Sequence, residues 1–275
     1  MASAENGLSW LGNLPAHPVF NGRLVPLNSL RHEVPRPSYV LQDLGMPKGL
    51  TAHEVCQLDQ LSVGQRRFKR GECIYTAGMA LEALYSVRRG SAKASIQVED
   101  GREQVTGFPV AGELIGFDGI GAGVHQCSAS ALEDGEVSLI PFVRLEYFAR
   151  QIPALQHHVN RLLGVELVRE QQKMFMLGSL RADERLAWFL LDFAHRNLAR
   201  GYSASEFVLH MTRADLGSFL GLTLETVCRL FSRFQLAGLI VFRQKVVKVV
   251  DRPSLRALLG GTDRAGADRT AGRPY

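Results

Sequence analysis

Residues 212–240 constrain the fold of this chain more than any other segment. They read Thr-Arg-Ala-Asp-Leu-Gly-Ser-Phe-Leu-Gly-Leu-Thr-Leu-Glu-Thr-Val-Cys-Arg-Leu-Phe-Ser-Arg-Phe-Gln-Leu-Ala-Gly-Leu-Ile. Apolar residues recur every three or four positions on both sides of a Gly-Leu turn, which predicts helices over residues 213–220 and 223–236. Two helices joined by a tight turn are typical of proteins that place the second helix in the major groove of DNA.

The second predicted helix has one apolar side and one side suited to reading bases. The apolar stripe consists of Val227, Leu230, Phe231 and Phe234, and the opposite side carries Leu224, Glu225, Cys228, Arg229 and Ser232, with Arg233 one turn further on. Arg229 can donate to guanine O6 and N7, Glu225 can accept from cytosine N4, and Leu224 can touch a thymine methyl group. The simpler alternative for Glu225 and Arg229 is a surface ion pair worth ~0.3–0.5 kcal/mol.

Several further residues are placed to contact phosphates. Thr223 is a good N-cap for the second helix, and Thr212 and Arg213 stand at the start of the first, so both helix N-termini can face a phosphate. Short strands predicted over residues 241–242 and 246–250 flank Arg243-Gln244-Lys245, a basic hairpin that would form a wing. These residues extend the candidate DNA surface beyond the second helix.

The distribution of charge agrees with this interpretation. The net charge is +5, and residues 178–275 hold 15 Lys and Arg against 9 Asp and Glu, whereas residues 1–177 hold 17 against 18. The positive excess therefore lies beside the helix pair and favours double-stranded DNA as the partner. Charge alone would fit an ordinary basic surface equally well.

The rest of the chain divides into four further predicted parts. Six of the eleven prolines fall in the first 47 residues, so residues 1–50 are predicted to form an irregular arm. Short apolar runs broken by Gly and Asp over residues 66–140 predict an antiparallel β sandwich or roll within residues 51–150. A dimerisation helix over residues 151–178 would lead into the DNA-binding domain, residues 179–258, and residues 259–275 would fray.

The predicted long helix begins at Pro153 and carries a narrow apolar seam. Its members recur every three or four residues and are Val159, Leu163, Leu167, Glu170, Met174 and Leu177. We expect two copies to pack along this seam, because two-fold DNA readers need a dimer axis; the alternative is packing against the helix's own β domain. In a parallel dimer Glu170 would meet its own copy and repel it, unless both carboxylates stay solvated at the rim.

Several classes of protein are excluded or disfavoured. No apolar run is long enough to span a membrane and the N-terminus lacks a secretory pattern, so a soluble cytoplasmic protein is expected. The four cysteines show no C-x-x-C spacing, which favours reduced thiols over a zinc or dithiol site. No G-x-S-x-G, H-E-x-x-H or P-loop motif is present, and we predict no enzymatic activity.

Four segments of the sequence can be compared with known families. They are Leu-Gly-Leu-Thr-Leu-Glu-Thr-Val-Cys-Arg-Leu at 220–230, Glu-Gln-Val-Thr-Gly-Phe at 103–108, Gly-Glu-Leu-Ile-Gly-Phe-Asp at 112–118 and Glu-Arg-Leu-Ala at 184–187. Together they resemble the CRP/FNR family of bacterial transcription regulators, its FNR branch in particular. The resemblance implies an α+β fold: a cyclic-nucleotide-binding-like antiparallel β-roll sensor domain, a long dimerisation helix and a C-terminal winged helix-turn-helix. It also implies a homodimer, a palindrome of TTGAT-like half-sites read by Glu225 and Arg229, and contact with RNA polymerase.

Two departures from the family concern cofactors. Oxygen-sensing members hold an iron–sulfur cluster on N-terminal cysteines and one cysteine of the roll, but residues 1–50 contain no cysteine and Ser138 stands at the roll position. Members that bind cyclic AMP use a Gly-Glu and an Arg-Ser pair, where this chain has Gly116-Phe117 and Cys127-Ser128. We therefore predict neither the [4Fe–4S] cluster nor cyclic AMP binding, and no metal site.

The input signal stays open at this stage. Oxidation of Cys228 on the reading helix could block DNA binding, and some relatives sense nitric oxide through haem. Conceivable haem ligands are His17, His32, His53, His125, His157 and His158. A signal-independent regulator, an unidentified small effector in the roll, and a sensor that acts through protein contacts with a vestigial helix-turn-helix are further alternatives.

Overall fold

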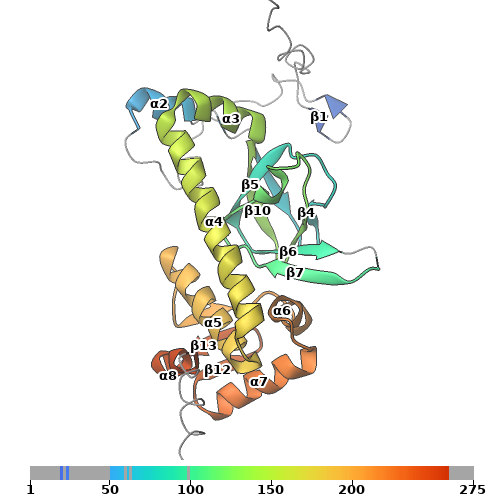
Figure 1. Cartoon of the computed structure of the whole chain (residues 1–275), viewed down its shortest axis with the longest axis vertical. Helices are drawn as coiled ribbons and strands as arrows, with labels where there is room; N and C mark the ends of the chain where they lie inside the picture. Colours follow the sequence, from blue (N-terminus) through green and yellow to red (C-terminus); the bar gives the residue numbers. More distant parts are fainter. Residues whose placement is uncertain are drawn as a thin grey trace, which may run out of the picture.

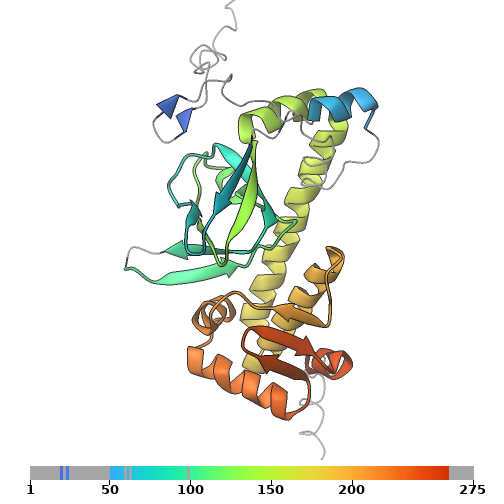
Figure 2. The same ribbon diagram turned by 180° about the vertical axis from the view of Figure 1, so that it is seen from behind.

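The computed structural model describes residues 19–20, 23–24, 50–58, 61, 64–97 and 100–259. It confirms the predicted α+β architecture: a β roll, a long helix running beside it, and a helix-rich unit at the far end of that helix (Figures 1 and 2). The predicted arm lies outside the described residues, except for Leu50 and one antiparallel strand pair, β1 (Val19–Phe20) and β2 (Arg23–Leu24). The predicted tail also lies outside them beyond residue 259. No helix in these described ranges is long and apolar enough to cross a membrane.

The roll consists of two four-stranded antiparallel sheets. The first has the order β3 (Gly64–Phe68), β10 (Gly135–Pro141), β5 (Ala83–Arg89), β8 (Leu114–Ile115), and the second has the order β4 (Cys73–Tyr75), β9 (Ser128–Ala131), β6 (Ala92–Gln97), β7 (Glu103–Gly107). Side chains from both sheets, among them Val87, Ala129 and Val137, are fully buried between them. Strands β3 and β9 read Gly-Gln-Arg-Arg-Phe and Ser-Ala-Ser-Ala, and such sequences form strands mainly through pairing with their neighbours.

Three helices form a second layer against the first sheet. They are α2 (Ala52–Leu58), α3 (Phe142–Gln151) and α4 (Pro153–Ser179). A proline occupies the first turn of α4, as predicted, where its missing N–H costs nothing. Leu58, Leu145 and Leu155 close a small core between these helices and the roll. Helix α4 then runs the length of the molecule and carries the C-terminal unit at its end (Figure 1).

The C-terminal unit is a winged helix-turn-helix. It comprises α5 (Ala182–Ala199), β11 (Glu206–Val208), α6 (Arg213–Leu220), α7 (Leu224–Leu236), β12 (Ile240–Arg243), β13 (Val246–Val249) and α8 (Arg252–Ala257). Its three strands pair antiparallel in the order β11-β13-β12. Gly221 ends α6 with a φ of 63°, a left-handed conformation that glycine adopts without strain. The unit packs around aromatic side chains, chiefly Phe189, Phe219 and Phe234.

Helix α4 exposes a broad apolar face that only partly matches the predicted seam. Leu167 and Met174 are 61% and 71% exposed, but Val159 and Leu163 are partly buried, with Val159 packed on the core beneath the helix. The face instead extends to Val165, Val168 and Phe175, each at least half exposed. Since Val168 and Phe175 lie seven residues apart, they share one side of the helix. The exposed side is therefore rotated relative to the predicted one. At its edge Glu170 forms an ion pair with Lys173, and Leu177 remains exposed.

Candidate nucleic-acid interface

Helix α7 is capped and amphipathic in the way its sequence predicts. The Thr223 hydroxyl accepts a hydrogen bond from the Thr226 N–H at 3.2 Å and so satisfies one of the free donors at the helix start. All four residues of the predicted apolar stripe are buried, and all five on the opposite side, Leu224, Glu225, Cys228, Arg229 and Ser232, are exposed. The helix lies at the end of the molecule farthest from α3 (Figures 1 and 2).

The two candidate base readers do not bind each other. The Arg229 guanidinium donates to the Thr226 hydroxyl at 3.3 Å, and in the part of the chain that the structure describes Arg229 forms no ion pair with Glu225. The simple surface pair considered from the sequence is therefore wrong for this structure. Ser232 donates back to the Cys228 carbonyl at 3.2 Å and stays on the helix surface. Glu225 and Arg229 are consequently both available to a partner molecule.

Arg233, in contrast, is engaged within the protein. Its guanidinium lies 2.8 Å from the Asp183 carboxylate in the first turn of α5. Burial raises the pKa of Asp183, but the hydrogen bond and the charge of Arg233 outweigh it, and the pKa is lowered. The pair joins α7 to α5 and partly neutralises a cation that the sequence suggested for DNA. The sequence carried no signal for this contact, since the two residues lie fifty positions apart.

Arg213 packs on two aromatic rings between the helix pair and the wing. Its guanidinium carbon lies 3.1 Å from the ring centroid of Phe231 on α7 and 4.1 Å from that of Phe242 on β12. The two rings meet edge to face at 5.3 Å. Burial lowers the pKa of Arg213 to about 10, so the group remains a cation at neutral pH. A guanidinium held against ring faces keeps its N–H donors in a fixed plane, ready for an anion.

The hydroxyl of the exposed residue Thr212 caps α6. It forms a capping box with Asp215: the Thr212 hydroxyl donates to the carboxylate at 2.6 Å and accepts from the Asp215 N–H at 3.0 Å. The same carboxylate also binds Lys93 of β6 at 3.0 Å. A carboxylate at a helix N-terminus stabilises the helix but repels a phosphate. The expectation that this helix start binds phosphate through Thr212 is therefore weakened.

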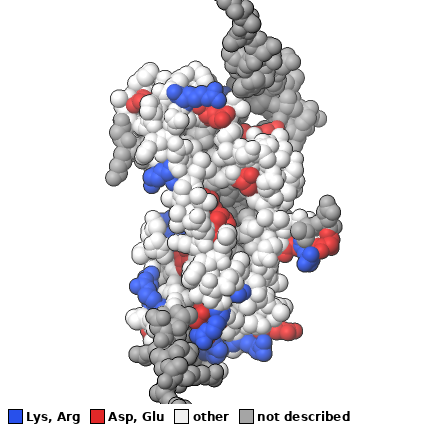
Figure 3. All heavy atoms as spheres, in the orientation of Figure 1, with Lys and Arg blue, Asp and Glu red and all other residues white. Residues whose placement is uncertain are grey.

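The wing presents two exposed cations. Strands β12 and β13 are joined at Gln244, whose φ of 55° is the single left-handed conformation of a non-glycine residue among the described residues. Arg243 and Lys245 flank it, and both are exposed. Lys and Arg side chains gather at the end of the molecule that α7 and the wing occupy (Figure 3). Cations therefore border the reading helix on more than one element.

A pocket of about 420 Å³ lies between the roll and α4. Its lining is mostly apolar, with charged side chains of both signs: the carboxylates are Glu113, Asp118, Glu166, Glu170 and Asp192, and the cations are Arg169, Lys173 and Arg196. At one end the Asp118 carboxylate accepts the backbone N–H groups of Gln126 and Cys127 at 2.8 and 3.0 Å. His125 is 1% exposed beside them and stacks on Tyr75 at 4.0 Å. Burial, with the nearby Asp118 charge, raises the pKa of Cys127 to about 12.

The described residues hold no grouping suited to a metal ion. No three His, Cys, Asp or Glu side chains within residues 64–97 and 100–259 lie close enough together to bind one. Ser138 is buried on β10 at 2% exposure. Among the candidate haem ligands, His53 and His157 are exposed, His158 is buried, and His17 and His32 lie outside the described residues.

A capped, outward-facing helix that follows a tight turn and precedes a basic wing defines a DNA-binding transcription regulator. Residues 184–258 match the Crp-like helix-turn-helix domain, and residues 65–151 match the cyclic nucleotide-binding domain. The chain belongs to the CRP/FNR family of transcription regulators. Regulators of this family bind DNA operators as dimers and are not enzymes, in agreement with the predicted lack of enzymatic activity.

Individual relatives span most of the chain. It is 43% identical to the transcriptional regulatory protein btr of Bordetella pertussis over 81% of this chain and 92% of the relative. It is 42% identical to electron transport regulator A of Shewanella oneidensis (79% and 87% covered) and 38% identical to the fumarate and nitrate reduction regulatory protein of Escherichia coli (81% and 89%). The structure of FixK2 from Bradyrhizobium japonicum is similar with a TM-score of 0.66 and 29% identity, covering 71% of this chain and 96% of FixK2.

Proposed function

We propose that this regulator reads a palindrome of TTGAT-like half-sites through α7 of each subunit of a homodimer. The observation that carries the proposal is the outer face of α7, where Glu225 and Arg229 are exposed and unpaired with each other. Arg229 would donate to guanine, Glu225 would accept from cytosine, and Leu224, 50% exposed, would touch a thymine methyl group. Cys228 and Ser232 complete the surface that enters the groove.

Phosphate contacts would flank this surface on both sides. The candidates beside α7 are Arg213, stacked on two aromatic rings, and Arg243 and Lys245 in the wing. The N-terminus of α7 itself, capped by Thr223, is a further candidate. Each neutralised phosphate adds sequence-independent affinity and steepens the salt dependence of binding. Arg233 and Thr212 contribute less, since both are engaged within the protein.

Two subunits would associate through the exposed apolar face of α4. This face consists of Val165, Leu167, Val168, Met174 and Phe175, with Leu177 and Glu170 at its edge. Exposed apolar side chains at two-turn spacing on one helix are suited to a parallel helix pair. To read a palindrome, such a pair has to set the two α7 helices about 34–36 Å apart, the separation of successive major grooves on one face of DNA.

A fluorescence-anisotropy titration tests the proposal. The probe is a labelled duplex containing TTGAT-N4-ATCAA, compared with a duplex of scrambled sequence, over a range of salt concentrations. We expect binding at least 1,000-fold tighter to the palindrome and a steep fall in affinity with salt for both duplexes. Equal affinity for the two duplexes, or binding that salt leaves unchanged, would contradict the proposal.

We infer that the regulator works without the family's iron–sulfur cluster and without cyclic AMP. A cluster needs several thiolates, whereas residues 1–50 have no cysteine and the roll offers Ser138. A cyclic phosphate needs cationic and N–H donors. Here the N–H groups of Gln126 and Cys127 bind Asp118, whose own charge would repel a phosphate. The residues present therefore do not fit either group.

Haem and thiol control are the alternative inputs. His125 is stacked on Tyr75 and fully enclosed, so it fits a haem ligand poorly. One observation favours control through the Cys228 thiol: the residue is exposed on the same face of α7 as Arg229. A visible spectrum of protein purified without oxygen tests for haem or a cluster. Operator binding before and after treatment with an oxidant, in the parent and in Cys228→Ser, tests the thiol. The cytoplasm as location and RNA polymerase as partner rest on the family resemblance.

A further inference from the structure

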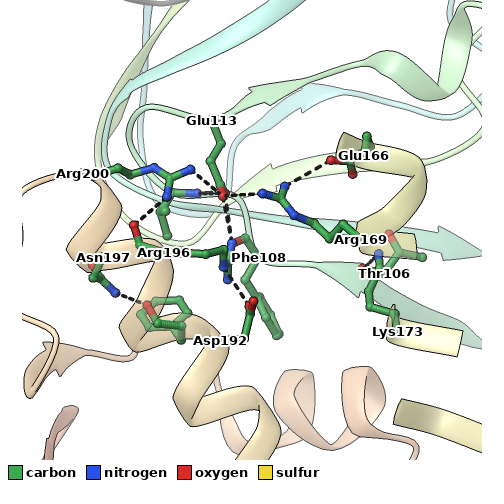
Figure 4. Close-up of polar contacts among 12 residues, drawn as sticks. Thr106, Phe108, Glu113, Glu166, Arg169, Lys173, Asp192, Arg196, Asn197 and Arg200 are labelled. Atoms are coloured by element: carbon green, nitrogen blue, oxygen red, sulfur yellow. Dashed lines mark hydrogen bonds and ion pairs between the residues drawn. The ribbon is translucent and has the colours of Figure 1, made fainter. Parts of the chain in front are cut away.

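A single buried carboxylate joins three parts of the molecule. Glu113 precedes β8 in the roll and is 5% exposed. Its oxygens lie 3.0 Å from Arg196 on α5, 2.7 Å from Arg200 at the C-cap of α5, and 3.4 Å from Arg169 on α4. The three guanidinium groups converge on this carboxylate from different directions (Figure 4). We call these four residues the Glu113 clasp.

The arginines of the clasp are themselves held in place. Arg196 also donates to the Phe108 carbonyl at 3.1 Å, and its Nε lies 3.0 Å from Asp192. Arg200 donates to the Arg196 carbonyl at 2.6 Å, and Arg169 pairs with Glu166 at 3.1 Å. Each guanidinium therefore has a second acceptor, which fixes its orientation toward Glu113.

A second contact between the roll and the DNA-binding unit lies beside the clasp. The Val105 N–H of β7 donates to the Ser218 hydroxyl of α6 at 2.9 Å, and that hydroxyl donates to the Glu103 carbonyl at 3.2 Å. The ring of Phe108, the residue after β7, lies 5.3 Å from the ring of Phe219 on α6. Helix α6, which supports α7, is thus packed directly on the roll.

We propose that Glu113 is a positioning residue for DNA binding: its clasp fixes the DNA-binding unit on the roll and thereby sets the direction in which α7 faces. This inference rests on the proposed function. The clasp is the one place among the described residues where roll, α4 and α5 share a buried ion pair. Removal of the carboxylate would leave three partly buried guanidinium groups to repel one another, which drives α5 away from the roll. A ligand or a structural change in the adjoining pocket that displaces Glu113 would therefore also change the direction in which α7 faces.

The test compares Glu113→Gln with Glu136→Gln in the full-length dimer. Glu136 forms an ion pair with Arg67 on the surface of the roll. Both residues belong to the roll, so among the described residues this pair does not connect the roll to α4 or to the DNA-binding unit. Two readouts are used: affinity for the TTGAT-N4-ATCAA duplex, and amide hydrogen exchange. For Glu113→Gln we expect at least tenfold weaker operator binding and faster exchange at Val105 and along α6, with the amides at Phe231 and Phe234 still protected. Glu136→Gln should match the parent, and Glu113→Asp should recover most of the affinity.

The outcomes separate this inference from the proposed function. Unchanged exchange and affinity in Glu113→Gln would overturn the clasp as a positioning device. If Glu113→Gln fails to fold, Arg200→Gln replaces it, since that side chain is 19% exposed and sits at the edge of the cluster; the same two changes are expected and their absence overturns the inference. A parent protein that ignores the duplex would refute the operator assignment, while the exchange data would still decide on the clasp.

Discussion

The outer face of α7 and the Glu113 clasp both depend on arginine side chains, but the arginines have opposite environments in the two regions. On α7, Arg229 is exposed, and its one hydrogen-bond partner among the described residues is a threonine hydroxyl. In the clasp, Arg196 and Arg200 are largely buried and share one carboxylate. An exposed guanidinium without a counter-charge is free to bind an external anion or base edge, whereas a buried, neutralised one fixes the protein's own elements.

This difference indicates what each region contributes. Substitutions on α7 should change which DNA is bound and leave folding intact. Substitutions in the clasp should change stability and the orientation of the DNA-binding unit, and affect all DNA sequences alike. Arg213 lies between these extremes, since it is half-buried on aromatic rings and has no carboxylate partner among the described residues.

The largest effect is expected on stability, from loss of the clasp. Burial raises the pKa of Glu113, but the charges of Arg196, Arg200 and Arg169 outweigh it and hold the pKa below its ordinary value of 4.5. A carboxylate whose folded pKa is lowered stabilises the fold above its unfolded pKa and loses that contribution as pH falls through the folded value. At pH 7, Glu113→Gln should cost about 3–5 kcal/mol, the typical loss when one member of a buried pair is removed.

Urea unfolding between pH 7 and pH 3 measures this contribution. The difference between parent and Glu113→Gln should be complete above pH 4.5 and shrink below it. The control, Glu136→Gln, removes an exposed ion pair and should change the free energy of unfolding by about 1 kcal/mol or less. A gap that persists undiminished at pH 3 would show that Glu113 acts through packing rather than charge.

The next effect is expected on base discrimination, from Arg229→Ala. Each lost guanine contact should cost about 1–3 kcal/mol of discrimination per half-site, with the free energy of unfolding unchanged. Anisotropy with operator and scrambled duplexes measures the ratio of affinities. Arg102→Ala, an exposed arginine on the β6–β7 hairpin, serves as control and should keep the parent ratio. Persistent discrimination in Arg229→Ala would remove α7 as the reading element.

Helix α7 could be predicted well from the sequence, whereas the Glu113 clasp could not be predicted at all. The 3.6-residue period is local, so the four buried and five exposed positions of α7 follow directly from the order of residues. Glu113 and Arg200 are 87 positions apart, and nothing local to either indicates that they meet. The same limit applies to the Arg233–Asp183 pair. Long-range ion pairs depend on packing that a single sequence does not display.

The seam on α4 is an intermediate case. Apolar residues at the predicted spacing are present, but two sides of this helix are apolar, and one of them packs on its own domain. Val159 covers that inner side, while Val168 and Phe175 complete the outer one. The periodicity of the sequence predicts that α4 has an apolar stripe. Packing of the helix on the roll determines which residues of that stripe remain exposed. Helix α8 was missed although Asp251 and Pro253 are ordinary start signals.

A smaller effect is expected from Arg213→Lys, which keeps the charge and removes the flat group stacked on Phe231 and Phe242. Loss of cation–π packing costs about 0.5–2 kcal/mol, so affinity should fall several-fold for operator and scrambled duplex alike. Because lysine can still neutralise a phosphate, the salt slope should stay the same, whereas Arg213→Met should reduce it by about 1. A slope that is unchanged in Arg213→Met would mean that this residue only holds the wing in place.

The smallest effect is expected from Glu170→Ala on dimerisation. If two α4 helices pair in parallel, the Glu170 carboxylates approach each other and repel, so their removal should strengthen the dimer. The ion pair with Lys173 offsets part of that repulsion, and the gain should stay below about 1 kcal/mol. Sedimentation equilibrium gives the dimer dissociation constants, with Glu146→Ala on α3 as a control that removes an exposed carboxylate away from the apolar face. Equal constants for Glu170→Ala and the parent would place Glu170 at a solvated rim, and weaker association would mean that its pair with Lys173 supports the interface.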